Sequence, residues 1–162
     1  MAPETRIGIG YDVHPVTEGR KLMLGCVHFA DSNVGLDGHS DADVVAHAIC
    51  DALLGAAGLG DIGEHFPPSD EKWKDHPGSA FLQAVGHMLR HAGHHIVNID
   101  CTVLADVVRL GDRKHQMAVT IASHLAIDRS RVSVKATTFE GHGTIGRGEV
   151  IACEAVASLH TR

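Results

Sequence analysis

Three side chains in the first third of the chain have the types and the spacing of metal ligands. Asp12 and His14 lie two residues apart in an alternating segment, so on a β-strand both side chains point to the same face. His47 lies in a later segment with helical periodicity, on a polar ridge with Asp43 and Asp51 at four-residue spacing. Two imidazoles and one carboxylate suit Zn²⁺, and an open fourth position is typical of a catalytic site. The alternative is that the ridge is only the solvated face of the helix.

A loop near the C-terminus, residues 135–149, combines the groups that proteins use to hold phosphates. It contains the hydroxyls of Thr137 and Thr138, several glycines, a lysine and Arg147. Glu140 among them favours a hard cation such as Mg²⁺ between carboxylate and phosphate oxygens. A plain surface turn is the alternative, and the lack of P-loop spacing leaves ATP hydrolysis unsupported. Spacing alone leaves open whether this loop meets the first group within one chain or across a subunit boundary.

Hydrophobic periodicity predicts the elements that position these groups. Residues 6–14 alternate as a strand that ends at Pro15. Residues 41–57 predict an amphipathic helix, with Ser40 as its N-cap and Asp43 as the capping-box acid. The other segments predict a hairpin at 21–29, helices at 78–92 and 113–125, and strands at 95–105, 132–136 and 148–160. This order indicates an α/β sandwich with a mixed sheet and helices over one face.

The composition is that of an ordinary globular domain, and residues 1–162 are expected to form a single catalytic domain. The formal net charge of -6, the lack of a Lys/Arg run and an aromatic content of 4% argue against nucleic acid as a partner. The four cysteines form no CxxC pair and suit small core residues of a reducing compartment. Without an apolar run of membrane-spanning length or a signal peptide, we expect no membrane contact and a cytoplasmic location.

Five short motifs give the chain a resemblance to a known enzyme family. They are Asp12-Val13-His14, Gly38-His39-Ser40-Asp41, Asp61-Ile62-Gly63, Lys135-Ala136-Thr137-Thr138 and Gly146-Arg147-Gly148-Glu149. In their order and spacing, over almost the whole chain, the sequence resembles the 2-C-methyl-D-erythritol 2,4-cyclodiphosphate synthase family. The resemblance implies an α/β (α+β) sandwich with a mixed, four-stranded type of sheet and a small β-hairpin. It also implies a homotrimer with active sites between subunits.

The resemblance further implies a reaction and two metal ions. Members of the family convert 4-diphosphocytidyl-2-C-methyl-D-erythritol 2-phosphate to the cyclic diphosphate and release CMP, in the non-mevalonate pathway to isoprenoid precursors. The chain would then be a metal-dependent phosphorus–oxygen lyase. Zn²⁺, or another divalent cation, is expected at Asp12, His14 and His47. A Mg²⁺ or Mn²⁺ ion at the diphosphate is expected to be held by Glu140.

Further residues receive roles by the same resemblance. His39 and Thr138 correspond to residues that stabilise the transition state, and Ser40 corresponds to a residue beside the substrate phosphates. The positions that hold the methylerythritol part match Asp61, Ile62 and Gly63, and the mobile flap beside it matches the segment from Phe66 to Asp70. The cytidine pocket matches Ala105, Arg109, Leu110, Gly111, Ala136 and Thr137, and Arg147 matches a residue near the threefold axis.

Two other functions stay open at this point. A metal-dependent phosphoesterase, with a zinc-bound water in the open position, would share both the metal ligands and the phosphate loop. A non-catalytic metal- or nucleotide-binding trimer would bind CMP without turnover. The chain departs from the family pattern at Arg109, where lysine is common, and at Thr144, where an aromatic residue is common.

Overall fold

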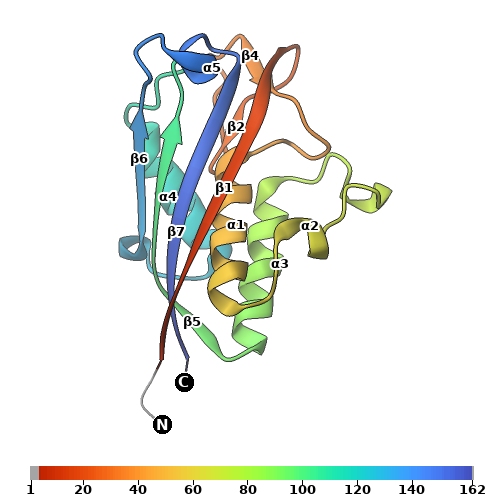
Figure 1. The fold of residues 1–162 in the computed structure, drawn as a ribbon, viewed down its shortest axis with the longest axis vertical. Helices are drawn as coiled ribbons and strands as arrows, with labels where there is room; N and C mark the ends of the chain where they lie inside the picture. The colour runs from red at the N-terminus through yellow and green to blue at the C-terminus, as the bar shows by residue number, and fades with distance from the viewer. Residues whose placement is uncertain (1–3, 162) are drawn as a thin grey trace.

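The computed structural model describes residues 4–161 and contains one five-stranded sheet covered by helices (Figure 1). The strands are β1 (Thr5–Glu18), β2 (Met23–Leu24), β3 (Val27–His28), β4 (Val34–Leu36), β5 (His94–Leu104), β6 (Val132–Thr137) and β7 (Val150–Thr161). The helices are α1 (Val44–Ala57), α2 (Ile62–His65), α3 (Gly78–His91), α4 (Arg113–Leu125) and α5 (Gly143–Gly146), with short 3-10 turns η1 (Glu71–Trp73) and η2 (Arg129–Arg131).

The main sheet has the strand order β4-β1-β7-β5-β6. Its β1–β4, β1–β7 and β5–β7 pairs are antiparallel, whereas β5 and β6 are parallel and are connected through α4. The long helices α1, α3 and α4 all lie on one face of this sheet (Figure 1). The mixed α/β architecture predicted from the sequence is therefore confirmed. Strands β2 and β3 form a separate antiparallel pair.

The strand count differs from the four-stranded type that the sequence predicted. The additional strand, β4, is three residues long and lies between the predicted hairpin at 21–29 and the predicted helix at 41–57, where no strand was expected. The first strand also continues past Pro15 to Glu18, because it exchanges partners there. Up to Pro15 it pairs with β7, and from Val16 onward it pairs with β4. Neither the short strand β4 nor the extension of β1 produces a periodic pattern of apolar residues in the sequence, because short edge strands need few apolar residues.

Helix α1 lies directly against β1, and two glycines in the strand permit this approach. A Cβ atom at Gly8 would overlap the carbonyl oxygen of Ala52, and one at Gly10 would overlap that of Ala48. Ten of the fourteen residues of α1 are buried, because the sheet and α3 enclose the helix. Close packing of this kind fixes the side chains on the two elements relative to one another.

The start of α1 differs from the prediction. The helix begins at Val44, and its N-cap is Asp43 rather than Ser40. The Asp43 carboxylate accepts hydrogen bonds from the backbone N–H groups of Val45 and Ala46 and also from those of Gly25 and Cys26. A carboxylate that ties the β2–β3 turn to the helix end satisfies four donors at once, which explains why this charged residue is fully buried. Asp43 is thus not part of a solvated ridge.

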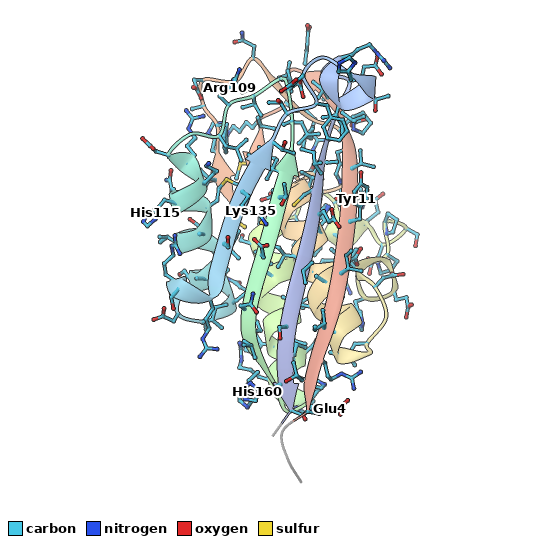
Figure 2. The ribbon with its side chains drawn as sticks, turned by 60° about the vertical axis from the view of Figure 1, so that its left-hand side comes forward. Glu4, Tyr11, Arg109, His115, Lys135 and His160 are labelled. Atoms are coloured by element: carbon cyan, nitrogen blue, oxygen red, sulfur yellow. The ribbon has the colours of Figure 1, made fainter. Side chains whose placement is uncertain are left out.

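The other face of the sheet carries a row of exposed apolar side chains (Figure 2). Exposed fractions along β1 are 71% for Ile7, 65% for Ile9, 58% for Tyr11 and 46% for Val13, and Val156 on β7 is 40% exposed. We call this row the open apolar face. A contiguous apolar surface of this kind marks an interaction site more often than a free surface. Among the helices that the structure describes, none has both the length and the hydropathy needed to cross a membrane.

Candidate active site

The structure brings Asp12 and His14 of β1 together with His47 of α1. The Asp12 Oδ2 atom lies 2.9 Å from His14 Nε2 and 3.1 Å from His47 Nδ1, and the two imidazole nitrogens are 3.3 Å apart. Asp12 and His14 are on the helix-facing side of β1, and His47 lies one turn after the N-cap of α1. Within residues 4–161 these three form the one group of metal-binding side chains whose ligand atoms converge closely enough to share an ion.

The spacing and the surroundings of the three ligand atoms fit a tetrahedral ion. For Zn²⁺ with ligand bonds of roughly 2.0–2.1 Å, tetrahedral geometry places neighbouring ligand atoms about 3.3 Å apart. The second nitrogen of each imidazole also has a partner. His14 Nδ1 lies 2.8 Å from the carbonyl oxygen of Asp37, and His47 Nε2 lies 3.1 Å from Ser40 Oγ. Such contacts fix the ring orientation and the tautomer of metal-binding histidines.

Electrostatics favours the metal-binding form of the carboxylate at this group. Burial raises the pKa of Asp12, but the hydrogen bonds and charges of His14 and His47 outweigh burial and lower this pKa to about 2. Burial lowers the pKa of His14, but the contact with Asp12 outweighs it, so that the net pKa of His14 is raised. The carboxylate is therefore ionised at neutral pH and attracts positive charge, whether a proton or a metal ion.

The cluster opens into a cavity of about 170 Å³ that contains several of the predicted site residues. Its lining comprises His14, His39, Ser40, His47, Ile62, Gly63, Phe66, Pro68, Trp73 and Phe81. His39 Nε2 is buried without a hydrogen-bond partner in the described part of the chain. A buried imidazole nitrogen left unpaired costs roughly 1–3 kcal/mol, which a ligand oxygen that reached it would recover. We call this cavity, with Asp12, His14 and His47, the metal end.

Two lining residues, Trp73 and Phe81, were not predicted as site residues. Trp73 packs edge-on against Phe66 with ring centroids 4.9 Å apart, and Phe81 packs edge-on against the His47 ring at 5.6 Å. Pro68 completes the apolar side of the cavity. Helical periodicity shows only that Phe81 faces inward, and the path of the 58–77 segment decides which other side chains reach the cavity. An apolar wall beside the ligands lowers the local dielectric and strengthens charge interactions there.

Asp61 and Asp70 do not line this cavity. Asp61 is the N-cap of α2 and accepts a hydrogen bond from the Glu64 N–H at 3.0 Å. Asp70 caps η1 and forms an ion pair with Lys72. Asp51, one turn beyond His47, accepts a hydrogen bond from the Ile62 N–H at 2.8 Å and so connects α1 to the start of α2. These acids support the loop that carries Ile62 and Gly63.

The remaining predicted residues lie together in a second region, at the ends of β5 and β6. The backbone N–H of Ala105 donates to the Thr137 carbonyl at 3.1 Å, so the segments 105–111 and 136–140 are neighbours. Asp106 fastens the second segment, since its carboxylate accepts from the N–H groups of Phe139 at 2.6 Å and Gly141 at 3.0 Å. These two hydrogen bonds lower the pKa of Asp106. We call the two segments the nucleotide end, because they contain the predicted cytidine pocket.

Most of the nucleotide end is exposed in the single chain. Every residue from 135 to 142 is exposed, including Thr138 and Glu140, and Arg109 and Gly111 are exposed as well. Leu110 and Ala105 are buried beneath them. Arg147, further along, forms a two-pronged ion pair with Glu149, with Nε 2.6 Å from Oε1.

The structure thus brings the residues of the metal end together, whereas the residues of the nucleotide end lie apart from them. The cavity of the metal end is lined by no residue of the nucleotide end. Glu140 belongs to no group of three or more converging ligand side chains within residues 4–161. A mixed α/β fold with two histidines and one aspartate around an open position defines a class of proteins with a candidate metal site beside a small-molecule cavity.

Comparison with known proteins narrows this class to a family. The model of the YgbB family matches residues 5–160. The 2-C-methyl-D-erythritol 2,4-cyclodiphosphate synthase of Desulfosudis oleivorans is 53% identical over 154 residues, which cover 95% of this chain and 91% of the relative. The chain belongs to the YgbB family, whose curated relatives at this level of identity carry that synthase name. The resemblance inferred from the five motifs is confirmed.

Solved structures agree with this assignment. The bifunctional IspDF from Campylobacter jejuni superposes with a TM-score of 0.95 at 42% identity, covering 99% of this chain. This chain spans only 43% of the length of that bifunctional protein. IspF of Plasmodium falciparum, solved as a CDP complex, superposes with a TM-score of 0.85 at 34% identity, covering 98% of this chain and 97% of the relative.

Proposed function

We propose that the chain catalyses the conversion of 4-diphosphocytidyl-2-C-methyl-D-erythritol 2-phosphate to 2-C-methyl-D-erythritol 2,4-cyclodiphosphate, with release of CMP. The observation that carries this proposal is the match to synthases of that name over nearly the whole chain, with the Asp12, His14 and His47 group intact. CDP complexes of two structural relatives support a cytidine nucleotide as substrate. The reaction makes the chain a phosphorus–oxygen lyase of the non-mevalonate pathway.

The two predicted metal ions would supply positive charge at the diphosphate. Asp12, His14 and His47 would hold Zn²⁺, as the ligand spacing supports, and Glu140 would hold Mg²⁺ or Mn²⁺. When bound, such ions polarise phosphate oxygens and neutralise the charge that develops on them. The chemistry of the donors supports this division, since imidazoles suit zinc and a lone carboxylate with phosphate oxygens suits magnesium.

The side chains of the two ends would orient the substrate rather than attack it. The nucleophile is the 2-phosphate of the substrate. One of its oxygens forms a bond to the β-phosphorus, the bond from that phosphorus to the bridging oxygen breaks, and CMP leaves with the electron pair. His39, Ser40 and Thr138 would donate hydrogen bonds to phosphate oxygens in the transition state. Because both phosphates belong to one molecule, holding them together supplies much of the acceleration.

The substrate would extend across both ends of the site. Ile62, Gly63 and Phe66 line the metal end and would contact the methylerythritol part. Asp61 and Asp70 would act at that part through the loop that they cap. At the nucleotide end, the cytidine would lie against a surface made by Ala105, Arg109, Leu110, Gly111, Ala136 and Thr137. Arg147 would lie near the threefold axis.

A homotrimer would join the metal end of one subunit to the nucleotide end of another. The open apolar face supports this assembly, because covering apolar side chains that are 40–71% exposed contributes about 25 cal/mol per Å². The separation of the two ends in one chain supports it as well. The cytoplasmic location stays a prediction of the sequence.

Incubation with the proposed substrate in the presence of Zn²⁺ and Mg²⁺, followed by phosphorus NMR and nucleotide chromatography, tests this function. We expect equimolar CMP and cyclic diphosphate. Linear phosphates in place of the cyclic product would favour the phosphoesterase. Binding of CMP without turnover, in metal-loaded protein, would favour the non-catalytic trimer.

A further inference from the structure

A second and larger cavity lies far from the metal end. It has a volume of about 400 Å³ and is enclosed by the C-terminal parts of α3 and α4, by Arg131 after α4, and by the first residues of β5. Along β7, Asp12 pairs with Cys153 and Thr5 pairs with His160, which lines this cavity. Seven strand positions separate Cys153 from His160, or roughly 23 Å. Figure 2 shows His160 at the end of the molecule opposite to Arg109.

Two arginines on the wall of this cavity are held by backbone carbonyls rather than by a close ion pair with a carboxylate. Arg90 donates from Nη1 to the Leu125 carbonyl at 3.3 Å, and Arg131 donates from Nη1 to the carbonyls of Ile96 at 2.8 Å and Val97 at 3.2 Å. Neither forms an ion pair within residues 4–161. Both guanidinium groups are therefore held in place by backbone carbonyls, while their Nε and Nη2 donors stay available.

Four of the eight arginines that the structure describes, among them Arg109 and Arg129, form no ion pair with a carboxylate. Four other arginines, Arg6, Arg20, Arg113 and Arg147, each have a carboxylate partner. The chain has 20 acidic residues against 14 Lys and Arg, so carboxylates are abundant. The one carboxylate in the cavity wall, that of Asp128, accepts hydrogen bonds from the N–H and hydroxyl of Ser130 and also interacts electrostatically with Arg131, so one negative charge faces the two arginines. The cavity is thus locally cationic on an acidic protein, which attracts anions.

The rest of the lining is a mixture of imidazole and apolar groups. His94 lines the cavity, and its Nδ1 is buried without a hydrogen-bond partner in the described chain. The floor is apolar and is formed by Leu89, Ile96 and Leu125. Gly86, in the middle of α3, leaves space beside Arg90. A Cβ atom at position 86 would lie 3.3 Å from the Arg90 Nη1 atom. A glycine inside a helix costs stability, and here its missing side chain keeps the wall open.

We propose that this cavity binds a small organic phosphate, with the oxyanion between the guanidinium groups of Arg90 and Arg131 and the organic part on the apolar floor. Planar guanidinium groups match phosphate oxygens with paired hydrogen bonds, whereas the floor offers a compact apolar surface with no hydrogen-bonding groups. An inorganic anion would contact only the two arginines, and a neutral apolar molecule would contact only the apolar floor. The site is independent of the proposed catalytic function.

The test uses the full chain loaded with metal, labelled at isoleucine methyl groups, with phenyl phosphate as the probe. Ile96 and Ile127 report on this cavity, and Ile62 reports on the metal end. We expect the Ile96 and Ile127 signals to shift with saturation, in a titration distinct from any shift of Ile62. Inorganic phosphate and phenol should each bind at least about tenfold more weakly than phenyl phosphate.

Substitutions separate a built site from general attraction of anions. Arg90→Gln and Arg131→Gln should each weaken phenyl phosphate binding at the Ile96 signal roughly tenfold or more. Arg129→Gln removes the same charge two positions from Arg131, outside this cavity, and should leave binding unchanged. Thermal melting checks that each variant is folded, and the two arginine variants provide independent measurements. Equal effects of the three substitutions, or shifts confined to Ile62, or phenol binding as tightly as phenyl phosphate, would overturn the proposal.

Discussion

The metal end and the nucleotide end differ in how much of each a single chain constructs. At the metal end, the three ligand side chains are only 13–26% exposed and have their hydrogen-bond partners in place. At the nucleotide end, every residue from 136 to 140 is exposed, and a single carboxylate, that of Asp106, fastens the loop. Preorganisation is thus built into the fold at one end, whereas the other end presents a surface that a second subunit would complete.

The first prediction removes a ligand from the metal end. His47→Ala should reduce bound zinc well below one ion per chain, because two remaining ligands hold the ion poorly. CMP release should fall roughly 100-fold or more, since charge stabilisation by the metal is worth several kcal/mol. Elemental analysis and the CMP assay measure both effects. His87→Ala, an exposed histidine on α3, is the matched control and should change neither. Stoichiometric zinc in the His47 variant would exclude this residue as a ligand.

Mixing two inactive variants tests whether each site takes its two ends from different subunits. His47→Ala and Thr138→Ala should each be nearly inactive as pure trimers. If each site takes one end from each of two subunits, random mixed trimers contain intact sites at roughly a quarter of the positions. Activity should therefore return when the two variants are unfolded and refolded together. Sites contained within single chains would show no recovery.

The second prediction separates the two ends by breaking the assembly. Ile9→Glu places a charge in the open apolar face, where burial against another subunit would desolvate it. We expect sedimentation to show monomers at micromolar concentration and CMP release to fall roughly tenfold or more, while zinc remains bound. Val119→Glu, on the exposed side of α4, is the matched control. A trimer that persists in the Ile9 variant would place the interface elsewhere.

Strand and helix periodicity could predict the convergence at the metal end. Asp12 and His14 share a strand face, and His47 lies near the start of a helix that must cover that face. Periodicity could not show that Asp43 caps the helix, because its partners at Gly25 and Cys26 come from a distant turn. Likewise, periodicity gives no information on the path of residues 58–77, which places Trp73 in the cavity.

The nucleotide end and the far cavity were harder to derive from the sequence for a different reason. Thr138 and Glu140 carry a chemical signal, but in the proposed trimer their surroundings would include a second copy of the chain. The far cavity combines the ends of α3 and α4 with the start of β5, and none of these ends contains a motif. Only the arrangement in space shows that Arg90 and Arg131 lie at one cavity and are held there by backbone carbonyls.

The third prediction disturbs the packing beneath the metal end. Gly10→Ala places a Cβ against the Ala48 carbonyl, so α1 must move away from β1. Overpacking of this kind lowers the free energy of unfolding by about 1–3 kcal/mol. Because His47 moves with α1, zinc affinity should fall along with stability, as chelator competition would show. Gly55→Ala, where no atom lies near the added Cβ and the backbone is helical, controls for the composition change. Loss of stability with unchanged zinc affinity would separate the packing from the site.

The last prediction tests the hydrogen bonds by which Asp106 holds the loop at the nucleotide end. Asp106→Ala removes the acceptor for the Phe139 and Gly141 N–H groups, so the loop with Thr138 should be held less firmly. We expect KM for the substrate to rise roughly three- to tenfold, with zinc content unchanged. Asp112→Ala, whose side chain makes no capping hydrogen bond, should leave KM as it is.

The pH dependence of the hydrogen bonds to the Asp106 carboxylate has a definite sign. The hydrogen bonds from Phe139 and Gly141 hold the folded pKa of Asp106 below the ordinary value of 3.8. Its contribution is therefore complete above the ordinary pKa and is lost as the pH falls through the lowered one. The amide signals of Phe139 and Gly141 should stay constant from pH 8 to pH 5 and move only below about pH 4. A midpoint above the ordinary pKa would show that the ionised carboxylate does not fasten the loop, and the exposed nucleotide end would then depend on the second subunit for its order as well as for its partner.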